Sequence, residues 1–262
     1  MPAAEVRGAQ IAYDDTGGDG PPVILAHGFL MDRTMFAPQV EALAPSHRVI
    51  TWDERGFGET VYDGEPFTYW DSAADCLGLL DQLGIDRAVV GGMSQGGFVT
   101  QRTALTAPER VRGLLLFNTQ AGTEDAEAIP LYQSLVDTWV ADGLSDDTAD
   151  FVASLILGTP ELAATWIPQW HAKPKAEMAQ PITTLLSRED LTGRLGEIAA
   201  PALVVHGTAD AAFSGDKADR LAAGLPGCDG VTWIDGGTHA ANLSHPTEVN
   251  AAVEKFLASL PA

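Results

Sequence analysis

A serine lies at the centre of a glycine-rich pentapeptide, Gly92-Met93-Ser94-Gln95-Gly96, between a β-rich run and a helical run. The pattern G-x-S-x-G is typical of a sharp strand-to-helix turn that lifts a serine hydroxyl above the edge of a sheet. Glycines two positions before and after the serine relieve the crowding of the backbone at such a turn. The start of the helix also provides a backbone N–H that can stabilise negative charge. We therefore predict that Ser94 is a nucleophile.

The segments on either side of this turn alternate between short β-rich runs and helical patterns, which is typical of βαβ units around a mostly parallel sheet. The predicted strands cover residues 6–13, 23–26, 48–52, 88–91, 111–117, 202–206 and 231–234. The predicted helices cover residues 35–44, 71–83, 94–107, 216–225 and 246–260. The middle strands are almost wholly apolar, as expected for strands that helices cover on both faces. The sequence therefore predicts an α/β fold with a central sheet flanked by helices.

This alternation stops between about residues 122 and 188, where prolines interrupt helical segments and no strand is predicted. The stretch is too long for a simple loop in a compact domain. We interpret residues 122–188 as a helical cap inserted into a core domain formed by residues 1–121 and 189–262. Caps of this kind exclude water and shape a substrate pocket. The alternative is a set of core helices with no direct contact to substrate.

Five segments in order along the chain give it the appearance of an α/β-hydrolase. They are His27-Gly28-Phe29, residues 53–58 (DERGFG), the turn around Ser94, residues 206–210 (HGTAD) and residues 236–239 (GGTH). The chain resembles the serine-nucleophile branch of the α/β-hydrolase superfamily over nearly its full length, and its segment pattern is similar to that of small carboxylesterases and enol-lactone hydrolases. The resemblance implies the α/β-hydrolase fold and a catalytic triad. It also implies that residues 53–58 support the loop architecture rather than the chemistry.

A serine hydroxyl is a weak nucleophile and needs a base within hydrogen-bond reach. The histidines after Ser94 are His171, His206, His239 and His245. His239 follows the last predicted strand and a Gly-Gly turn, in a loop at the sheet edge where ligands bind in such folds. His171 lies in the predicted cap, His206 ends a buried strand, and His245 precedes the last helix. We predict that His239 is the general base, and the resemblance implies the same role.

The triad also needs an acid that holds the imidazole in one tautomer. Asp210 comes just after the strand over residues 202–206, in the loop where the family places this residue. Some relatives carry the acid after the strand that follows the nucleophile helix, but here the strand over residues 111–117 is followed by Asn118 and Thr119, with no carboxylate. Glu124 and Asp125, further along, are weaker alternatives. We predict that Asp210 is the acid.

A tetrahedral intermediate needs two donors directed at its oxyanion. The first predicted donor is the Gln95 backbone N–H at the start of the nucleophile helix. The resemblance implies that the second is the Phe29 N–H, because His27-Gly28 follows a strand and allows the chain to turn back over the serine. His27 itself is expected to brace this loop.

Apolar residues could line a pocket for the acyl group of a substrate. The candidates are Met31, Trp139, Trp166 and Trp170, although apolar residues of this kind are more often plain core. The sequence contains no HExxH motif and no cysteine–histidine cluster, so we expect no metal and no cofactor. Cys76 and Cys228 are far apart and are expected to be free structural thiols.

The amino-acid composition argues against some classes of binding partner. The net charge is −21, from 36 acidic and 15 basic residues. This acidity argues against binding to nucleic acid or to an anionic membrane, both of which require a basic surface. A highly solvated surface or adaptation to high salt would each account for it. No apolar run approaches the about 20 residues that span a bilayer, and no signal peptide is visible, so a cytoplasmic location is expected.

Together these features predict an enzyme that hydrolyses a small carboxylic ester or lactone through an acyl-enzyme. The same three residues would also serve carbon–carbon bond hydrolysis or cofactor-free perhydrolysis, because fold and triad are shared among chemistries. A receptor that binds its ligand without turnover is a third possibility, although binding alone does not require all three residues. A small molecule is the expected partner. The acyl group, the leaving group and the oligomeric state do not follow from the sequence.

Overall fold

The computed structural model describes residues 2–125, 127 and 129–261. Residues 126 and 128, inside the predicted 122–188 insertion, and the chain ends 1 and 262 lie outside this part. An eight-stranded sheet forms the centre of the molecule, with strand order β1-β2-β4-β3-β5-β6-β7-β8. Its strands are β1 (Ala3–Val6), β2 (Ala9–Asp15), β3 (Pro22–Ala26), β4 (Arg48–Trp52), β5 (Ala88–Met93), β6 (Val111–Phe117), β7 (Ala202–Gly207) and β8 (Val231–Ile234). Each neighbouring pair from β4 to β8 is parallel. At the other end of the sheet, β1 pairs antiparallel with β2, and β2 pairs antiparallel with β4. The predicted fold class is confirmed.

One strand prediction was wrong. The segment over residues 6–13 is not a single strand, because the chain reverses at Arg7 and Gly8, which have φ angles of 48° and 80°. The segment therefore belongs to the β1–β2 hairpin, in which Val6 pairs with Ala9. A two-residue turn with positive φ at both positions matches the twist of antiparallel strands. Gly8 adopts this conformation without steric cost.

The helices lie on both faces of the sheet and give it two hydrophobic cores. They are α1 (Ala37–Leu43), α2 (Tyr69–Gln82), α3 (Gln95–Thr106), α4 (Ile129–Asp142), α5 (Asp146–Ile156), α6 (Pro160–Ala172), α7 (Ala179–Leu186), α8 (Gly215–Gly224), α9 (Ala241–Ser244) and α10 (Pro246–Ser259). Successive residues of a strand point to opposite faces. In β6, Leu114 and Leu116 accordingly join the core beneath α2, α3 and α8, while Leu115 and Phe117 join the core beneath α1 and α10. This double coverage explains why the central strands are almost wholly apolar.

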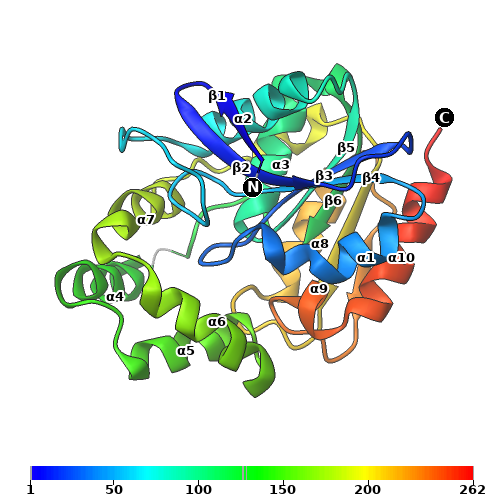
Figure 1. Ribbon diagram of the computed structural model, residues 1–262. Coiled ribbons are helices and arrows are strands. Elements are labelled where there is room, and N and C mark those ends of the chain that lie inside the picture. The colour runs from blue at the N-terminus through cyan, green and yellow to red at the C-terminus, as the bar shows by residue number, and fades with distance from the viewer. Residues whose placement is uncertain (1, 126, 128, 262) are drawn as a thin grey trace.

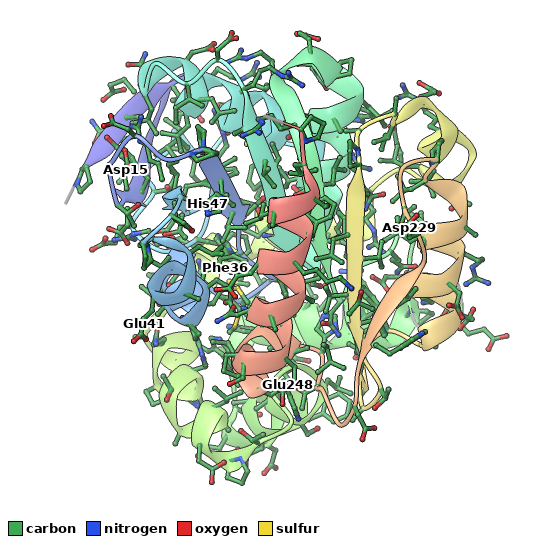
Figure 2. The ribbon with its side chains drawn as sticks, turned by 90° about the vertical axis from the view of Figure 1, so that its right-hand side faces the viewer. Asp15, Phe36, Glu41, His47, Asp229 and Glu248 are labelled. Carbon is green, nitrogen blue, oxygen red and sulfur yellow. The ribbon has the colours of Figure 1, made fainter. Side chains whose placement is uncertain are left out.

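Figures 1 and 2 show how these helices are arranged. α1 and α10 lie side by side over one face of the sheet, and the exposed Glu41 and Glu248 mark them in Figure 2. Helices α4–α7, which follow β6 and precede β7, gather at one end of the molecule in Figure 1, away from α10. We call α4–α7 the inserted helices. They cover residues 129–186 within the stretch where the sequence predicts no strand.

The register of the parallel strands brings their carboxyl ends together. Gly92 of β5 pairs with Ala26 of β3, and Met93 pairs with Phe117 of β6. Phe117 in turn pairs with Val205 of β7, and Gly207 pairs with Ile234 of β8. The loops that follow these strands therefore begin along a single edge of the sheet. Ser94, Asp210 and His239 all lie in those loops, although many residues separate them in the chain.

Candidate active site

Ser94 occupies the sharp turn between β5 and α3. Its backbone has φ 50° and ψ −109°, a strained conformation for a residue with a side chain. Such strain costs on the order of 1–3 kcal/mol and persists only when the surroundings impose it. Here a Cβ atom at Gly92 would collide with the backbone of Gly96, and one at Gly96 would collide with the Ala26 carbonyl. Both glycines are therefore required for α3 to begin so close to β3 and β5.

Hydrogen bonds fix this turn on both sides. The Ser94 N–H donates to the Phe117 carbonyl at 2.9 Å, and the Thr119 hydroxyl donates to the Ser94 carbonyl at 2.7 Å. The turn is thus tied to the end of β6, and the side chain of Ser94 is only 7% exposed.

Three side chains from different loops meet at this position. His239 Nε2 lies 3.0 Å from Ser94 Oγ, and His239 Nδ1 lies 2.9 Å from Asp210 Oδ2. Because a carboxylate can only accept, Nδ1 carries the proton, and Nε2 is then free to accept from the serine hydroxyl. This is the arrangement in which a histidine can take a proton from a serine. His171 and His245 have their polar contacts elsewhere.

Asp210 is held by donors from several directions. Its Oδ1 accepts from the Ala212 and Phe213 N–H groups, each at 2.8 Å, and its Oδ2 accepts from Asn118 Nδ2 at 2.9 Å. Burial raises the pKa of Asp210, but His239, Asn118 and the backbone donor of Phe213 outweigh it, and the net pKa is lowered. The carboxylate therefore stays ionised beside the imidazole.

Two contributors to this arrangement were missed by sequence reasoning. Asn118 was considered only as a position without a carboxylate, yet its side chain donates to Asp210 and to the Thr238 carbonyl. His206 is buried as expected; its Nε2 bonds to the Phe213 carbonyl at 3.0 Å and lies 3.4 Å from Asp210 Oδ2. The sequence feature that could have pointed to Asn118 and His206 is their position, because both lie at the carboxyl ends of central strands.

The two predicted oxyanion donors lie in the segments that flank Ser94. The Phe29 and Gln95 N–H groups have no hydrogen-bond partner among the described residues. Leu30, next to Phe29, has a φ of 66°, and the Met31 N–H donates to the Gly28 carbonyl at 3.1 Å, so this loop forms a tight turn. His27 braces the loop as expected, because its Nε2 accepts from the Glu54 N–H at 3.0 Å.

The side chain of Gln95 extends away from the site into a buried polar network that the sequence did not reveal. Its Nε2 donates to Glu54 Oε1 at 3.0 Å, and its Oε1 accepts from the Tyr69 hydroxyl at 3.1 Å. Burial raises the pKa of Glu54 to about 8. The raised pKa favours the neutral, protonated form of Glu54, which accepts the hydrogen bond from Gln95.

Residues 21–246 match the model of a family described as alpha/beta hydrolase fold. The chain belongs to this family. This α/β-hydrolase is 30% identical to RutD of Azorhizobium caulinodans, provisionally described as a carbamate hydrolase, with 98% of each chain covered. It is also similar to a thermophilic esterase from Thermogutta terrifontis (28% identity, 98% and 97% covered, TM-score 0.88). An enol-lactonase from Burkholderia xenovorans LB400 matches equally well in structure (26% identity, 98% and 100% covered, TM-score 0.88).

A cavity of about 150 Å³ in this α/β-hydrolase contains Ser94 and His239 in its wall. The inserted helices α4, α5 and α7 supply most of the remaining wall, with apolar side chains such as Val136, Val152 and Ile182. Phe29 and Phe213 complete it from the loops of the core. The space next to the serine is therefore bounded mostly by apolar groups.

The four pocket residues predicted from the sequence do not all line the cavity at Ser94. Trp139 lines the cavity, whereas Met31 and Trp170 line a neighbouring cavity that Trp139 also borders. Trp166 is 4% exposed and packs in the hydrophobic core beneath the inserted helices. Met31, Trp166 and Trp170 are thus not among the residues that line the cavity at Ser94. Their apolar character serves packing, as large buried side chains usually do.

The loop over residues 53–58 is structural, as expected. Asp53 accepts from the Arg33 guanidinium and from the Arg33 and Glu59 N–H groups. Arg55 donates to both carboxylate oxygens of Asp75, at 2.6 and 3.0 Å.

Within the described residues, no group of three or more His, Cys, Asp or Glu side chains could hold a metal ion. None of the described helices is long and apolar enough to cross a membrane.

Proposed function

We propose that this α/β-hydrolase is a serine hydrolase that cleaves a small carboxylic ester or lactone through an acyl-enzyme. The observation that carries the proposal is the hydrogen-bonded chain from Ser94 Oγ through His239 to Asp210, with distances of 3.0 and 2.9 Å. A serine hydroxyl becomes an effective nucleophile when such a base accepts its proton. Asp210 fixes the imidazole tautomer and stabilises the imidazolium that forms.

In the first half of the reaction, Ser94 Oγ attacks the substrate carbonyl while His239 Nε2 takes the hydroxyl proton. The tetrahedral intermediate collapses as His239 returns that proton to the leaving alcohol. In the second half, His239 removes a proton from a water molecule, which attacks the acyl-serine, and then protonates Ser94. With a lactone, the leaving alcohol stays attached to the acyl group, and the product is a hydroxy acid.

The oxyanion of each intermediate would accept hydrogen bonds from the Phe29 and Gln95 N–H groups. Their freedom from other partners among the described residues supports this role. Donors that are already in position need no reorganisation when charge develops, and one such donor is worth about 10²–10³-fold in rate. The buried contacts of the Gln95 side chain with Glu54 and Tyr69 hold the Gln95 N–H at the start of α3.

We also propose that residues 122–188 act as a cap over the site. The apolar wall that the inserted helices contribute would exclude bulk water and receive the apolar part of a substrate. Relatives named for ester, lactone and carbamate hydrolysis share attack at an acyl carbon attached to oxygen or nitrogen. This common chemistry supports a carboxylic acyl substrate.

The proposal is tested with 4-nitrophenyl butanoate and a phosphonate that labels reactive serines. We expect a burst of 4-nitrophenol followed by steady turnover, and a mass increase from the phosphonate that maps to Ser94. Ser94→Ala should lose both signals, with turnover reduced by about 10⁴-fold or more. Ser259→Ala, at an exposed serine of α10, is the matched control and should retain both. Undiminished turnover by Ser94→Ala would refute the mechanism.

A further inference from the structure

A buried ion pair lies at the wall of the cavity that contains Ser94. Glu124 is one of the lining residues, and its Oε1 lies 2.8 Å from Arg188 Nη2. The side chains of Glu124 and Arg188 are only 9% and 1% exposed. Among the described lining residues there is no lysine or arginine, and Glu124 is the acidic one. The charge that faces the substrate space is therefore a carboxylate, and the cation lies behind it.

Arg188 cannot move away from this position without losing several contacts. Its Nε donates to the Gly122 carbonyl at 3.1 Å and its Nη1 donates to the Leu185 carbonyl at 2.8 Å. The guanidinium also lies over the Phe98 ring, 4.3 Å from the ring centroid. A charge buried in this way requires a counter-charge. Glu124, from the segment after β6, supplies it.

A substrate with a carboxylate on its acyl chain would offer Arg188 a competing anion. Arginine binds carboxylates well because its planar group presents several donors. Nη2 has no aligned hydrogen-bond partner among the described residues, so its contact with Glu124 is an ion pair alone. As long as Glu124 is present, however, a second carboxylate in this apolar cavity would meet a like charge and lose its hydration. The net charge of −21 repels anions over longer distances as well.

We propose that Glu124 determines acyl specificity: it satisfies Arg188 internally, so that the cavity accepts neutral apolar acyl groups and excludes acyl groups that end in a carboxylate. This inference rests on the proposed function, because it assumes that the acyl part of an ester occupies the cavity at Ser94. Tyr132 and Thr148, which also line the cavity, are uncharged and compatible with a neutral chain.

The test compares three 4-nitrophenyl esters of similar chain length, with hexanoyl, 6-hydroxyhexanoyl and 5-carboxypentanoyl groups. For the wild type, we expect kcat/KM for the carboxylate ester to be about 100-fold below that for the hexanoyl ester, with the hydroxyl ester much nearer to the hexanoyl ester. Glu124→Gln leaves Arg188 without its counter-charge and should raise kcat/KM for the carboxylate ester by about tenfold. The readout is the ratio of kcat/KM between the carboxylate and hexanoyl esters, because a loss of stability or of general activity in Glu124→Gln would lower both values together.

Asp125→Asn is the matched control. It removes the same charge one residue along the chain, but the Asp125 side chain is 72% exposed and pairs with Lys217 at 3.0 Å. Its ratio of kcat/KM between the carboxylate ester and the hexanoyl ester should equal that of the wild type. An unchanged ratio in Glu124→Gln, or the same gain in Asp125→Asn, would overturn the assignment.

The wild-type comparison is decisive even if Glu124→Gln does not fold. Equal hydrolysis of the carboxylate and hexanoyl esters would overturn the inference while leaving the proposed function intact. Discrimination against the hydroxyl ester as strong as that against the carboxylate ester would also overturn it, because polarity rather than charge would be responsible. If the wild type hydrolysed none of the three and the phosphonate did not label Ser94, the proposed function itself would fail.

Discussion

The carboxyl edge of the sheet and the inserted helices border the same cavity, but different interactions hold them in place. At the sheet edge, strand pairing sets the backbone, and each key side chain has directional polar contacts; Asp210 alone accepts from His239, Asn118 and two backbone N–H groups. The inserted helices share a hydrophobic core with α1 and α10. Their hydrogen bonds to the rest of the chain include those from Gln180 and Thr184 to the Phe67 carbonyl.

This difference predicts how each region responds to substitution. Hydrogen bonds depend strongly on distance and angle, so a change at the sheet edge should disturb the geometry of the chemical step. Apolar contacts are non-directional and tolerate repacking when volume is kept. Changes in the inserted helices should therefore alter which substrate fits more than how fast a fitting substrate reacts.

The largest expected effect comes from Asp210→Asn. The amide cannot hold the imidazole in the required tautomer, and kcat should fall by about 10⁴-fold while the fold remains intact. Steady-state kinetics with 4-nitrophenyl butanoate and a thermal melt measure the two quantities. Asp216→Asn, at an exposed carboxylate nearby in the chain, should leave kcat unchanged. A kcat loss of less than about tenfold in Asp210→Asn would show that the hydrogen bonds at the sheet edge matter less for the chemical step than we expect.

A smaller loss at the same edge is expected for Asn118→Gly. Asn118 has a φ of 44°, which glycine adopts freely, so the substitution removes the bonds to Asp210 and to the Thr238 carbonyl without adding backbone strain. A hydrogen bond to a charged group is worth about 1.5–3 kcal/mol, and kcat should fall by about 10–100-fold with little change in KM. Asn250→Ala removes a polar network between α1 and α10 and should lower stability without lowering kcat. Equal kcat losses in both variants would mean that Asn118 acts only through stability.

In the inserted helices, Val152→Phe tests selection by size. Val152 lines the cavity from α5, and a phenyl ring there would reduce the space for a long acyl chain. We expect kcat/KM for the hexanoyl ester to fall by about tenfold while the acetyl ester changes by less than about threefold, because one overpacked contact costs on the order of 1–3 kcal/mol. Ser154→Phe adds the same ring at an exposed position of α5 and should change neither ester. Equal losses for both esters in Val152→Phe would indicate damage to the site rather than a shorter pocket.

The difference between the two regions also explains how far the sequence could predict this molecule. The strands over residues 48–52, 111–117 and 231–234 were predicted with their observed bounds, because short runs rich in apolar, β-branched and aromatic residues between turn residues leave few alternatives. Ser94 was found because the glycines of its turn are local in sequence. The β1–β2 hairpin was missed because one glycine inside an alternating run is a weak sign of a chain reversal.

Contacts between distant segments could not be predicted in the same way. Glu54 lies 41 residues from Gln95, and Asn118 lies 92 residues from Asp210. No periodicity in the sequence connects such pairs, which meet only because parallel strands align their carboxyl ends. The cavity wall was the least predictable part, since a tryptophan on a helix packs equally well against core or against an open space. Trp139 and Trp166 have the same side chain and different surroundings.

The smallest expected effect on activity, but a clear one on stability, concerns the buried network behind Ser94. The pKa of Glu54 is raised by burial from 4.5 to about 8, so the folded protein retains a proton that the unfolded chain loses between these values. Stability should therefore be fully present below about pH 4.5 and decline as pH rises to about 8, by up to about 1.4 kcal/mol per pH unit from this group. Glu54→Gln keeps the acceptor for Gln95 but cannot titrate, and its kcat at pH 7 should stay within about threefold of the wild type.

Denaturant unfolding of both proteins at pH 5, 6.5 and 8 isolates this contribution, because every other titrating group is common to the two and cancels in the difference. As the pH is raised from 5 to 6.5 and from 6.5 to 8, the free energy of unfolding of the wild type should fall relative to that of Glu54→Gln. Parallel stability profiles would mean that Glu54 is ionised in the folded protein, with a negative charge buried directly beneath Gln95. The sheet edge would then tolerate a buried carboxylate next to Gln95. Its contrast with the apolar inserted helices would rest on strand pairing rather than on satisfied polar groups.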